Sequence, residues 1–226
     1  MIPWADWRMS EIQTLIFDWD GTLSDSVGHI VKAMVGAAQS LDLPSPGEQA
    51  VRNIIGLALP EAVATLYPDM QDAQLAEALA RAYSVQYLAL EERPAPLFDG
   101  VRDALENFRL AGFKLAVATG KGRQGLSRVL QSHALTNFFD ITRCADECPS
   151  KPHPRMLEEI LNHLETPASR AVMLGDSEFD IRMARNARVR AVAVSYGAQS
   201  REHLLQSGPE HCIDAFSEFP GWVMSS

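Results

Sequence analysis

Two aspartates that stand two residues apart, Asp18 and Asp20, are the first residues of the chain whose types and spacing could do chemistry. They follow a short apolar run, residues 12–17, and in an extended backbone this spacing sends both carboxylates to the same face. Two carboxylates so close do not ionise with equal ease, so one can act as a nucleophile while the other holds a proton. The pair therefore suggests nucleophilic and acid–base chemistry, although two aspartates that merely cap a loop would show the same pattern.

A second group of residues could bind a phosphate. Thr119 and Gly120 directly follow another apolar run, residues 113–118. A hydroxyl with free backbone amides ahead of a helix forms an anion site. Lys151 precedes the prolines at the expected start of a later helix, where it could neutralise both a carboxylate nucleophile and a phosphate. Lys121 competes for that role, and we favour Lys151.

A third group, which begins at Gly175, adds two carboxylates. Asp176 leaves the strand expected over 171–174 and Asp180 falls one helical turn later, so both can face one site. Hard carboxylate oxygens, completed by water and substrate phosphate oxygens, suit Mg²⁺. Glu178 is expected to be exposed rather than a ligand.

Strands and helices that alternate along the chain must position these three groups of residues. Beyond residue 100, short apolar runs alternate with amphipathic segments, which predicts a parallel sheet with helices on both faces. In such sheets ligands bind beyond the carboxyl ends of the strands, where these groups stand. The expected strands are 12–17, 113–118, 138–142, 171–174, 191–194 and 212–213, and the expected helices are 101–110, 123–132, 155–164, 179–187 and 201–206.

A block with a different pattern separates the first strand from the others. Apolar residues at helical spacing predict helices over 26–41, 48–55, 60–66 and 72–91. The proline-rich stretch 93–96 follows as a stiff linker. We therefore predict a doubly wound α/β core over 1–26 and 93–226, with a small all-helical domain over 27–92 inserted after the first strand.

These groups, in this order, resemble the motifs of the haloacid dehalogenase-like (HAD) superfamily. The motifs are Asp-x-Asp-Gly-Thr, a Thr or Ser after the second core strand, a Lys, and Gly-Asp-x-x-x-Asp. The resemblance covers roughly residues 12–219 and includes a helical cap after the first motif, as in the phosphoglycolate phosphatase-like branch. Trp19 replaces the aliphatic residue that is more usual between the two aspartates, which leaves the chemistry unchanged.

The resemblance implies hydrolysis of a phosphate ester in two steps. Asp18 would attack phosphorus to form an aspartyl-phosphate, and Asp20 would protonate the leaving oxygen and then activate water. Thr119 and Gly120 would hold phosphate oxygens, while Lys151 would stabilise the nucleophile and the charge of the transition state.

The resemblance also implies a metal site. Mg²⁺ would be bound by Asp18, Asp176 and the carbonyl of Asp20, with Asp180 either ligating directly or standing behind the ligands. The helical cap would close over the site, exclude water and select the leaving group.

Two alternatives stay open. A sugar-phosphate mutase of the β-phosphoglucomutase type keeps both acids, but it usually carries Glu-Asp where this chain has Gly175-Asp176, which favours a hydrolase. A binding module without catalysis is the second alternative, and the presence of all the acids and Lys151 argues against it.

Substrate choice is expected to depend on the cap. Arg52 stands where related phosphatases bring a cap loop to the substrate, and it could meet a second anionic group such as a carboxylate; a solvated surface arginine fits the sequence equally well. We expect a small phosphorylated metabolite, phosphoglycolate-like or a sugar phosphate.

Composition and charge narrow the class of protein further. The chain has 226 residues, of which 46% are hydrophobic, and a net charge of −9, which excludes a largely disordered chain and argues against a nucleic-acid partner. If the aspartates converge as expected, part of this negative charge would lie beside Mg²⁺. Three cysteines are too few for a disulfide scaffold, and neither a membrane span nor a signal peptide is visible. We therefore expect a cytoplasmic protein with no membrane partner; the sequence carries no signal for oligomeric state.

Overall fold

Six short parallel strands form the central sheet, in a computed structural model that describes residues 11–226. Their order is β3-β2-β1-β4-β5-β6, so β1 lies in the middle between β2 and β4. The strands are β1 (Thr14–Phe17), β2 (Lys114–Ala118), β3 (Ile141–Arg143), β4 (Ala171–Gly175), β5 (Arg190–Val194) and β6 (His211–Ile213). Because helices cover both faces, the four central strands, β1, β2, β4 and β5, are apolar along most of their length rather than at alternate positions.

The helices of the core divide between the two faces of the sheet. Alternate residues of β1 show the division, because Leu15 and Phe17 belong to one apolar cluster and Ile16 belongs to another. The first face is covered by α5 (Val101–Leu110), α6 (Arg123–Ser132) and α10 (Phe219–Met224). The second face is covered by α7 (Arg155–His163), α8 (Glu178–Asn186) and α9 (Arg201–Gln206).

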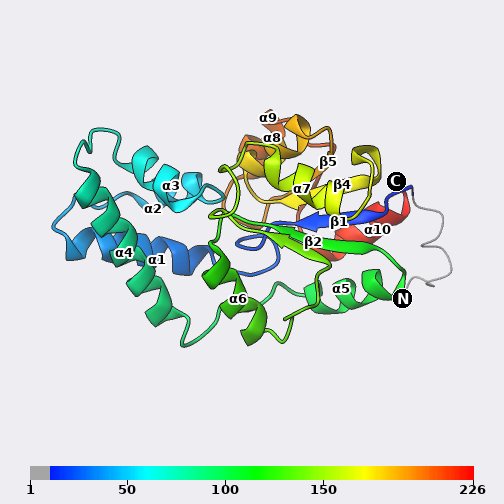
Figure 1. Cartoon of the computed structure of the whole chain (residues 1–226), viewed down its shortest axis with the longest axis horizontal. Coiled ribbons are helices and arrows are strands. Elements are labelled where there is room, and N and C mark those ends of the chain that lie inside the picture. Colours follow the sequence, from blue (N-terminus) through cyan, green and yellow to red (C-terminus); the bar gives the residue numbers. More distant parts are fainter. Residues whose placement is uncertain (1–10) are drawn as a thin grey trace.

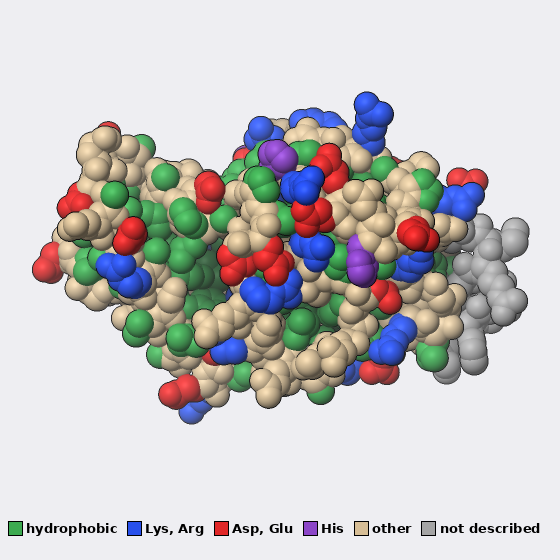
Figure 2. Space-filling view, in the orientation of Figure 1, with side chains coloured by type: hydrophobic (Ala, Val, Ile, Leu, Met, Phe, Trp, Pro, Cys, Tyr) green, Lys and Arg blue, Asp and Glu red, His purple; other side chains and the backbone are tan. Residues whose placement is uncertain are grey.

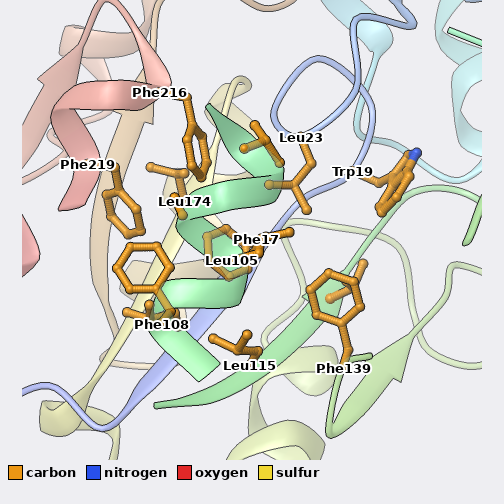
Figure 3. Packing of buried hydrophobic residues seen from close by; sticks show 14 of the residues in the cluster. Phe17, Trp19, Leu23, Leu105, Phe108, Leu115, Phe139, Leu174, Phe216 and Phe219 are labelled. Atoms are coloured by element: carbon orange, nitrogen blue, oxygen red, sulfur yellow. The ribbon is translucent and has the colours of Figure 1, made fainter. Parts of the chain in front are cut away.

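Aromatic side chains fill much of the first face. Phe108, Phe216 and Phe219 gather beside Phe17 (Figure 3), and the Phe17 and Phe219 ring centroids are 6.0 Å apart in an edge-to-face arrangement. Trp19 is buried in the same cluster, as its place between two aspartates that face the site requires. Its unusual side chain therefore contributes to the core.

Two expectations for the core need correction. The strand expected over 138–142 is only the short β3, and Phe138 and Phe139 lie in the turn before it, 5.5 Å apart between ring centroids. These phenylalanines are apolar because they pack on the core, whereas pairing with β2 begins at Ile141. The short helix α10 was not predicted, because six residues are too few to show a helical period.

Of the five helices between β1 and β2, the first four form a separate lobe beyond the end of the sheet to which β1 leads (Figure 1). They are α1 (Val27–Ser40), α2 (Glu48–Ile54), α3 (Leu59–Leu66) and α4 (Ala73–Leu90), and we call them the cap. Two apolar clusters hold them together, and one of these clusters also includes Ala198 of the core. The predicted fold class, a doubly wound parallel sheet with a helical cap inserted after the first strand, is confirmed.

Two chain segments join the cap to the core, and they are hydrogen-bonded to each other. The Asp25 amide donates to the Pro96 carbonyl at 2.9 Å, and the Phe98 amide donates to the Leu23 carbonyl at 3.0 Å. We propose that the domain boundaries lie at these segments, so that the core comprises residues 1–26 and 93–226 and the cap comprises residues 27–92. Residues 1–10 lie outside the described residues. Within residues 11–226, no helix is both long and apolar enough to cross a membrane.

Candidate active site

Three buried carboxylates meet at the carboxyl ends of β1 and β4. One oxygen from each of Asp18, Asp176 and Asp180 lies within 4.8 Å of the others. The parallel pairing of β1 with β4 brings them together, because the Asp18 amide donates to the carbonyl of Leu174 at 2.9 Å. Asp18 thus stands beside the point where β4 leads into α8.

Hydrogen bonds hold the two carboxylates that follow β4. The Ala198 amide donates to Asp176 Oδ2 at 2.7 Å. Gly197 beside it has no room for a side chain, since a Cβ there would lie 2.3 Å from Asp176 Cβ. The Ser177 hydroxyl donates to Asp180 Oδ2 at 2.6 Å. The same two residues form the capping box that begins α8, in which the Ser177 amide donates to Asp180 Oδ2 and the Asp180 amide donates to the Ser177 hydroxyl.

Lys151 supplies the positive charge in this group. Its Nζ lies 3.0 Å from Asp18 Oδ1 and 2.6 Å from Asp180 Oδ1, and its side chain is fully buried. Burial lowers the pKa of Lys151, but Asp18 and Asp180 outweigh that effect and raise the pKa above its ordinary value. Lys151 is therefore charged, and one cation faces three carboxylates.

The shortage of positive charge shows in the carboxyl pKa values. Burial raises the pKa of Asp18 from 3.8 to about 7; Lys151 opposes this shift, and Asp180 and Asp20 add to it. Burial likewise raises the pKa of Asp176 well above its ordinary value, and the charges of Asp18 and Asp180 raise it further. The group therefore gains from a further cation.

The residues of this group fit Mg²⁺. They offer hard carboxylate oxygens, and Asp18 Oδ1 is buried without a hydrogen-bond partner among residues 11–226, although Lys151 Nζ is close to it. Asp180 is already occupied by Lys151 and Ser177, which suits a place behind the ligands. Asp20 does not contribute its side chain to the group, so its ligand role through the carbonyl stays a prediction.

Asp20 is held by a separate pair of contacts. The Ser26 hydroxyl donates to Asp20 Oδ1 at 2.7 Å, and Lys121 Nζ lies 3.1 Å from Asp20 Oδ2. Lys121 also lies 4.4 Å from the centroid of the Tyr87 ring and donates to the Tyr87 hydroxyl at 3.2 Å. The two lysines that competed in the sequence thus have different partners: Lys151 meets Asp18 and Lys121 meets Asp20.

A cavity of about 520 Å³ opens between the cap and the core. Asp18, Asp20, Thr119 and Gly120 line it from the core. Figure 2 shows the hollow between the two lobes, with hydrophobic side chains on its walls and charged side chains along its rim on the core side. A substrate in this cavity would reach Asp18 and Asp20 together.

The comparison with known families agrees with this geometry. The model of the haloacid dehalogenase-like hydrolase family matches residues 15–194. The chain belongs to this family. It resembles a probable phosphatase, IndB, from Dickeya dadantii, with 32% identity over 92% of this chain and 91% of the relative. It also resembles a phosphoglycolate phosphatase from Colwellia psychrerythraea, with 29% identity over 93% of this chain and 96% of the relative.

The comparison with solved structures finds the same fold. The crystal structure of a predicted phosphoglycolate phosphatase from Haemophilus somnus superposes with a TM-score of 0.86 at 22% identity, over 95% of this chain and 99% of that one. The family match and the named relatives confirm the expected class, a HAD-like hydrolase of the phosphoglycolate phosphatase-like branch and a phosphatase.

Two residues singled out in the sequence lie outside this hydrolase's site. Arg52 is paired with Glu48 at 3.0 Å on the surface of α2 and does not line the cavity. Its contact with substrate therefore stays a prediction, and in this structure it would require Arg52 to leave Glu48. Glu178 pairs with Arg182 at 3.2 Å and is not in the carboxylate group, as expected.

Sequence reasoning missed several residues that hold or line the site. Ser26 lies at the expected start of the helix over 26–41, and Tyr83 and Tyr87 lie within the helix expected over 72–91, but none of the three was singled out. Ser26 holds Asp20, and both tyrosines line the cavity. Their one-turn spacing is the same for a core stripe and for a cavity wall, so the pattern does not distinguish them. Ala198 acts through its backbone amide, which leaves no signal in the sequence.

The cap lies close against the core at Gly120. A Cβ at this position would lie 2.7 Å from the carbonyl oxygen of Gly56 and 2.8 Å from that of Leu57. We expect Gly120→Ala to push the cap loop away from the core and lower kcat/KM by about tenfold or more, since a small misplacement of the site is costly. Unfolding in urea should change little, because the neighbours are loop carbonyls. A wild-type kcat/KM for Gly120→Ala would contradict the expected clash between the new side chain and the cap loop.

The raised pKa of Asp18 predicts how stability depends on pH. Between 3.8 and about 7 the folded protein holds a proton on Asp18 that the unfolded chain has released, so this group's contribution to stability is lost as pH rises through about 7. The slope from one such proton is at most about 1.4 kcal/mol per pH unit. Urea unfolding in EDTA, compared between wild type and Asp18→Asn from pH 4 to 8, should show this difference. If the free energy of unfolding depends on pH in the same way for both proteins, the pKa of Asp18 is not raised.

Proposed function

We propose that this hydrolase is a magnesium-dependent phosphatase that releases phosphate from a small phosphorylated metabolite through an aspartyl-phosphate on Asp18. One observation carries the proposal: Asp18 and Asp20 line the same cavity, while Asp18 is also in contact with Lys151 and the other buried carboxylates. A nucleophile and a proton donor thus reach one substrate from adjacent positions, each with its own lysine.

Asp18 would attack phosphorus. Lys151, 3.0 Å from Asp18 Oδ1, keeps the nucleophile in place and offsets the negative charge that grows on the phosphoryl oxygens. Thr119 and the backbone at Gly120 line the cavity at the end of β2 and would bind phosphoryl oxygens ahead of α6.

Asp20 would handle the protons. It would give a proton to the leaving oxygen in the first step and take one from water in the second. The Ser26 hydroxyl and Lys121 hold its two carboxylate oxygens, which restricts the carboxyl group to one orientation. The contact of Lys121 with Tyr87 links this orientation to α4 of the cap.

Asp18 and Asp176 would hold Mg²⁺ directly, with Asp180 beside them and the Asp20 carbonyl as a further ligand. When bound, the ion would neutralise the buried carboxylates and polarise the phosphoryl group.

A screen of small phosphate monoesters, with Mg²⁺ and with EDTA, tests the proposal. We expect release of inorganic phosphate that requires Mg²⁺ and is lost in Asp18→Asn. Activity confined to conversion between phosphate isomers would instead indicate the mutase, and no turnover of any ester would indicate the binding module. A cytoplasmic location, as expected from the sequence, stays a prediction.

A further inference from the structure

The wall that the cap contributes to the cavity is almost entirely apolar. It includes Ile30 and Met34 of α1, Ile54 at the end of α2, and Tyr83, Tyr87 and Leu88 of α4, with the loop 55–58 between α2 and α3. Among the described cap residues that line the cavity, the one charged side chain is Glu61, which is acidic. The leaving group of a substrate would lie against this wall, because Asp18 and Asp20 occupy the core side.

The basic residues of the cavity are already paired. Within residues 11–226, Lys121 and Arg128 are the two basic residues that line it. Lys121 pairs with Asp20 at 3.1 Å, and Arg128 pairs with Glu91 at 2.8 Å. A second anionic group on the substrate would therefore find no free cation, and it would meet the acidic side chains of Glu61 and Asp146.

The cap is seated on the core, so this lining is the one that a substrate meets. The Ala58 amide donates to the Ser150 hydroxyl at 2.9 Å. The Gln199 side chain donates to the Asn53 carbonyl at 3.4 Å, and the loop carbonyls of Gly56 and Leu57 lie against Gly120. These contacts join the end of α2 and the loop after it to three separate segments of the core.

From this lining we propose that the substrate is a phosphate monoester whose alcohol part is uncharged and carries an apolar surface, rather than a carboxylate such as that of 2-phosphoglycolate. The inference rests on the proposed phosphatase function and concerns what that site selects. Burial of a carboxylate without a partner is costly, whereas burial of apolar surface is favourable. The cavity therefore favours the uncharged ester and rejects the anionic one.

A pair of nearly isosteric esters tests the preference. Isobutyl phosphate and 2-phosphoglycolate are both esters of primary alcohols, and two methyl groups in the first replace the two carboxylate oxygens in the second. We expect kcat/KM to be at least about tenfold higher for isobutyl phosphate, and higher again for 2-phenylethyl phosphate, which fills more of the cavity. Equal or higher kcat/KM for 2-phosphoglycolate would overturn the proposal.

A positive charge placed on the cap wall should offset the preference for the uncharged ester. Leu88 lines the cavity and is 44% exposed, so Leu88→Lys can be accommodated without burial of the new charge. We expect this variant to raise kcat/KM for 2-phosphoglycolate by about tenfold relative to isobutyl phosphate. Val85→Lys is the matched control, because Val85 lies on the same helix, is 66% exposed and does not line the cavity. If both variants gain equally in kcat/KM for 2-phosphoglycolate, the net charge of the protein, and not the lining of the cavity, determines the preference.

A binding measurement separates failure of this inference from failure of the proposed function. Asp18→Asn, titrated calorimetrically with each ester in Mg²⁺, should bind isobutyl phosphate more tightly than 2-phosphoglycolate. If wild type hydrolyses esters and either measurement favours the carboxylate, only the inference fails. If no ester is hydrolysed or bound, the proposed function fails and the inference fails with it.

Discussion

Replacement of Asp18 by asparagine is expected to remove turnover and, in the same protein, to make the metal-free fold more stable at about pH 8. Turnover should fall by about 10⁴-fold or more, because an amide cannot act as the nucleophile that forms the aspartyl-phosphate. Stability should rise because three buried carboxylates share one lysine, and the pKa of Asp18, raised to about 7, reports the free energy that its ionisation costs. We expect a gain on the order of 1–3 kcal/mol in the free energy of unfolding.

Two measurements check this prediction separately. Phosphate release with Mg²⁺ reports the loss of activity, and urea unfolding in EDTA reports the gain in stability. Asp69→Asn serves as the control, since Asp69 is exposed in the cap and far from the carboxylate group in the chain. A variant that is both inactive and less stable than wild type would mean that Asp18 is needed for the fold, contrary to the electrostatic argument.

Replacement of Lys151 by methionine should have the opposite effect on stability. Methionine keeps much of the volume of the side chain but removes the charge that faces both Asp18 and Asp180. Because those carboxylates would then be buried without their cation, we expect the metal-free protein at about pH 8 to lose about 3–5 kcal/mol of unfolding free energy. Asp18→Asn and Lys151→Met, which remove the two partners of one ion pair, should thus change the free energy of unfolding in opposite directions.

Lys121→Met provides a matched comparison for the same measurement. It also removes a lysine that pairs with an aspartate, but Asp20 keeps the hydrogen bond from Ser26 and lines the cavity. Its loss of stability should therefore be clearly smaller than that of Lys151→Met. If the two variants unfold alike, the buried group around Lys151 does not carry the electrostatic imbalance described above. Either outcome is read from urea unfolding in EDTA.

Sequence patterns predicted the structure correctly where the residues concerned are close together in the chain. Asp18 and Asp20 share a face because a strand repeats every two residues, and Asp176 and Asp180 lie together because a helix turns every three or four. The alternation of apolar runs with amphipathic segments likewise determined the parallel sheet and the cap, since each pattern depends only on near neighbours in the chain. The weakest local signals failed, as for β3 and α10, where the elements are very short.

Only the tertiary structure decided which distant side chains meet. Lys121 and Lys151 are both placed after strands by the sequence, and their partners, Asp20 and Asp18, depend on how β2 and α7 pack beside β1. The same holds for the cavity wall, because Tyr83 and Tyr87 would be core residues if no hollow lay between cap and core. The sequence by itself thus determined the acids and the sheet edge that gathers them. Packing over long chain separations decided their charge partners and the apolar character of the space above them.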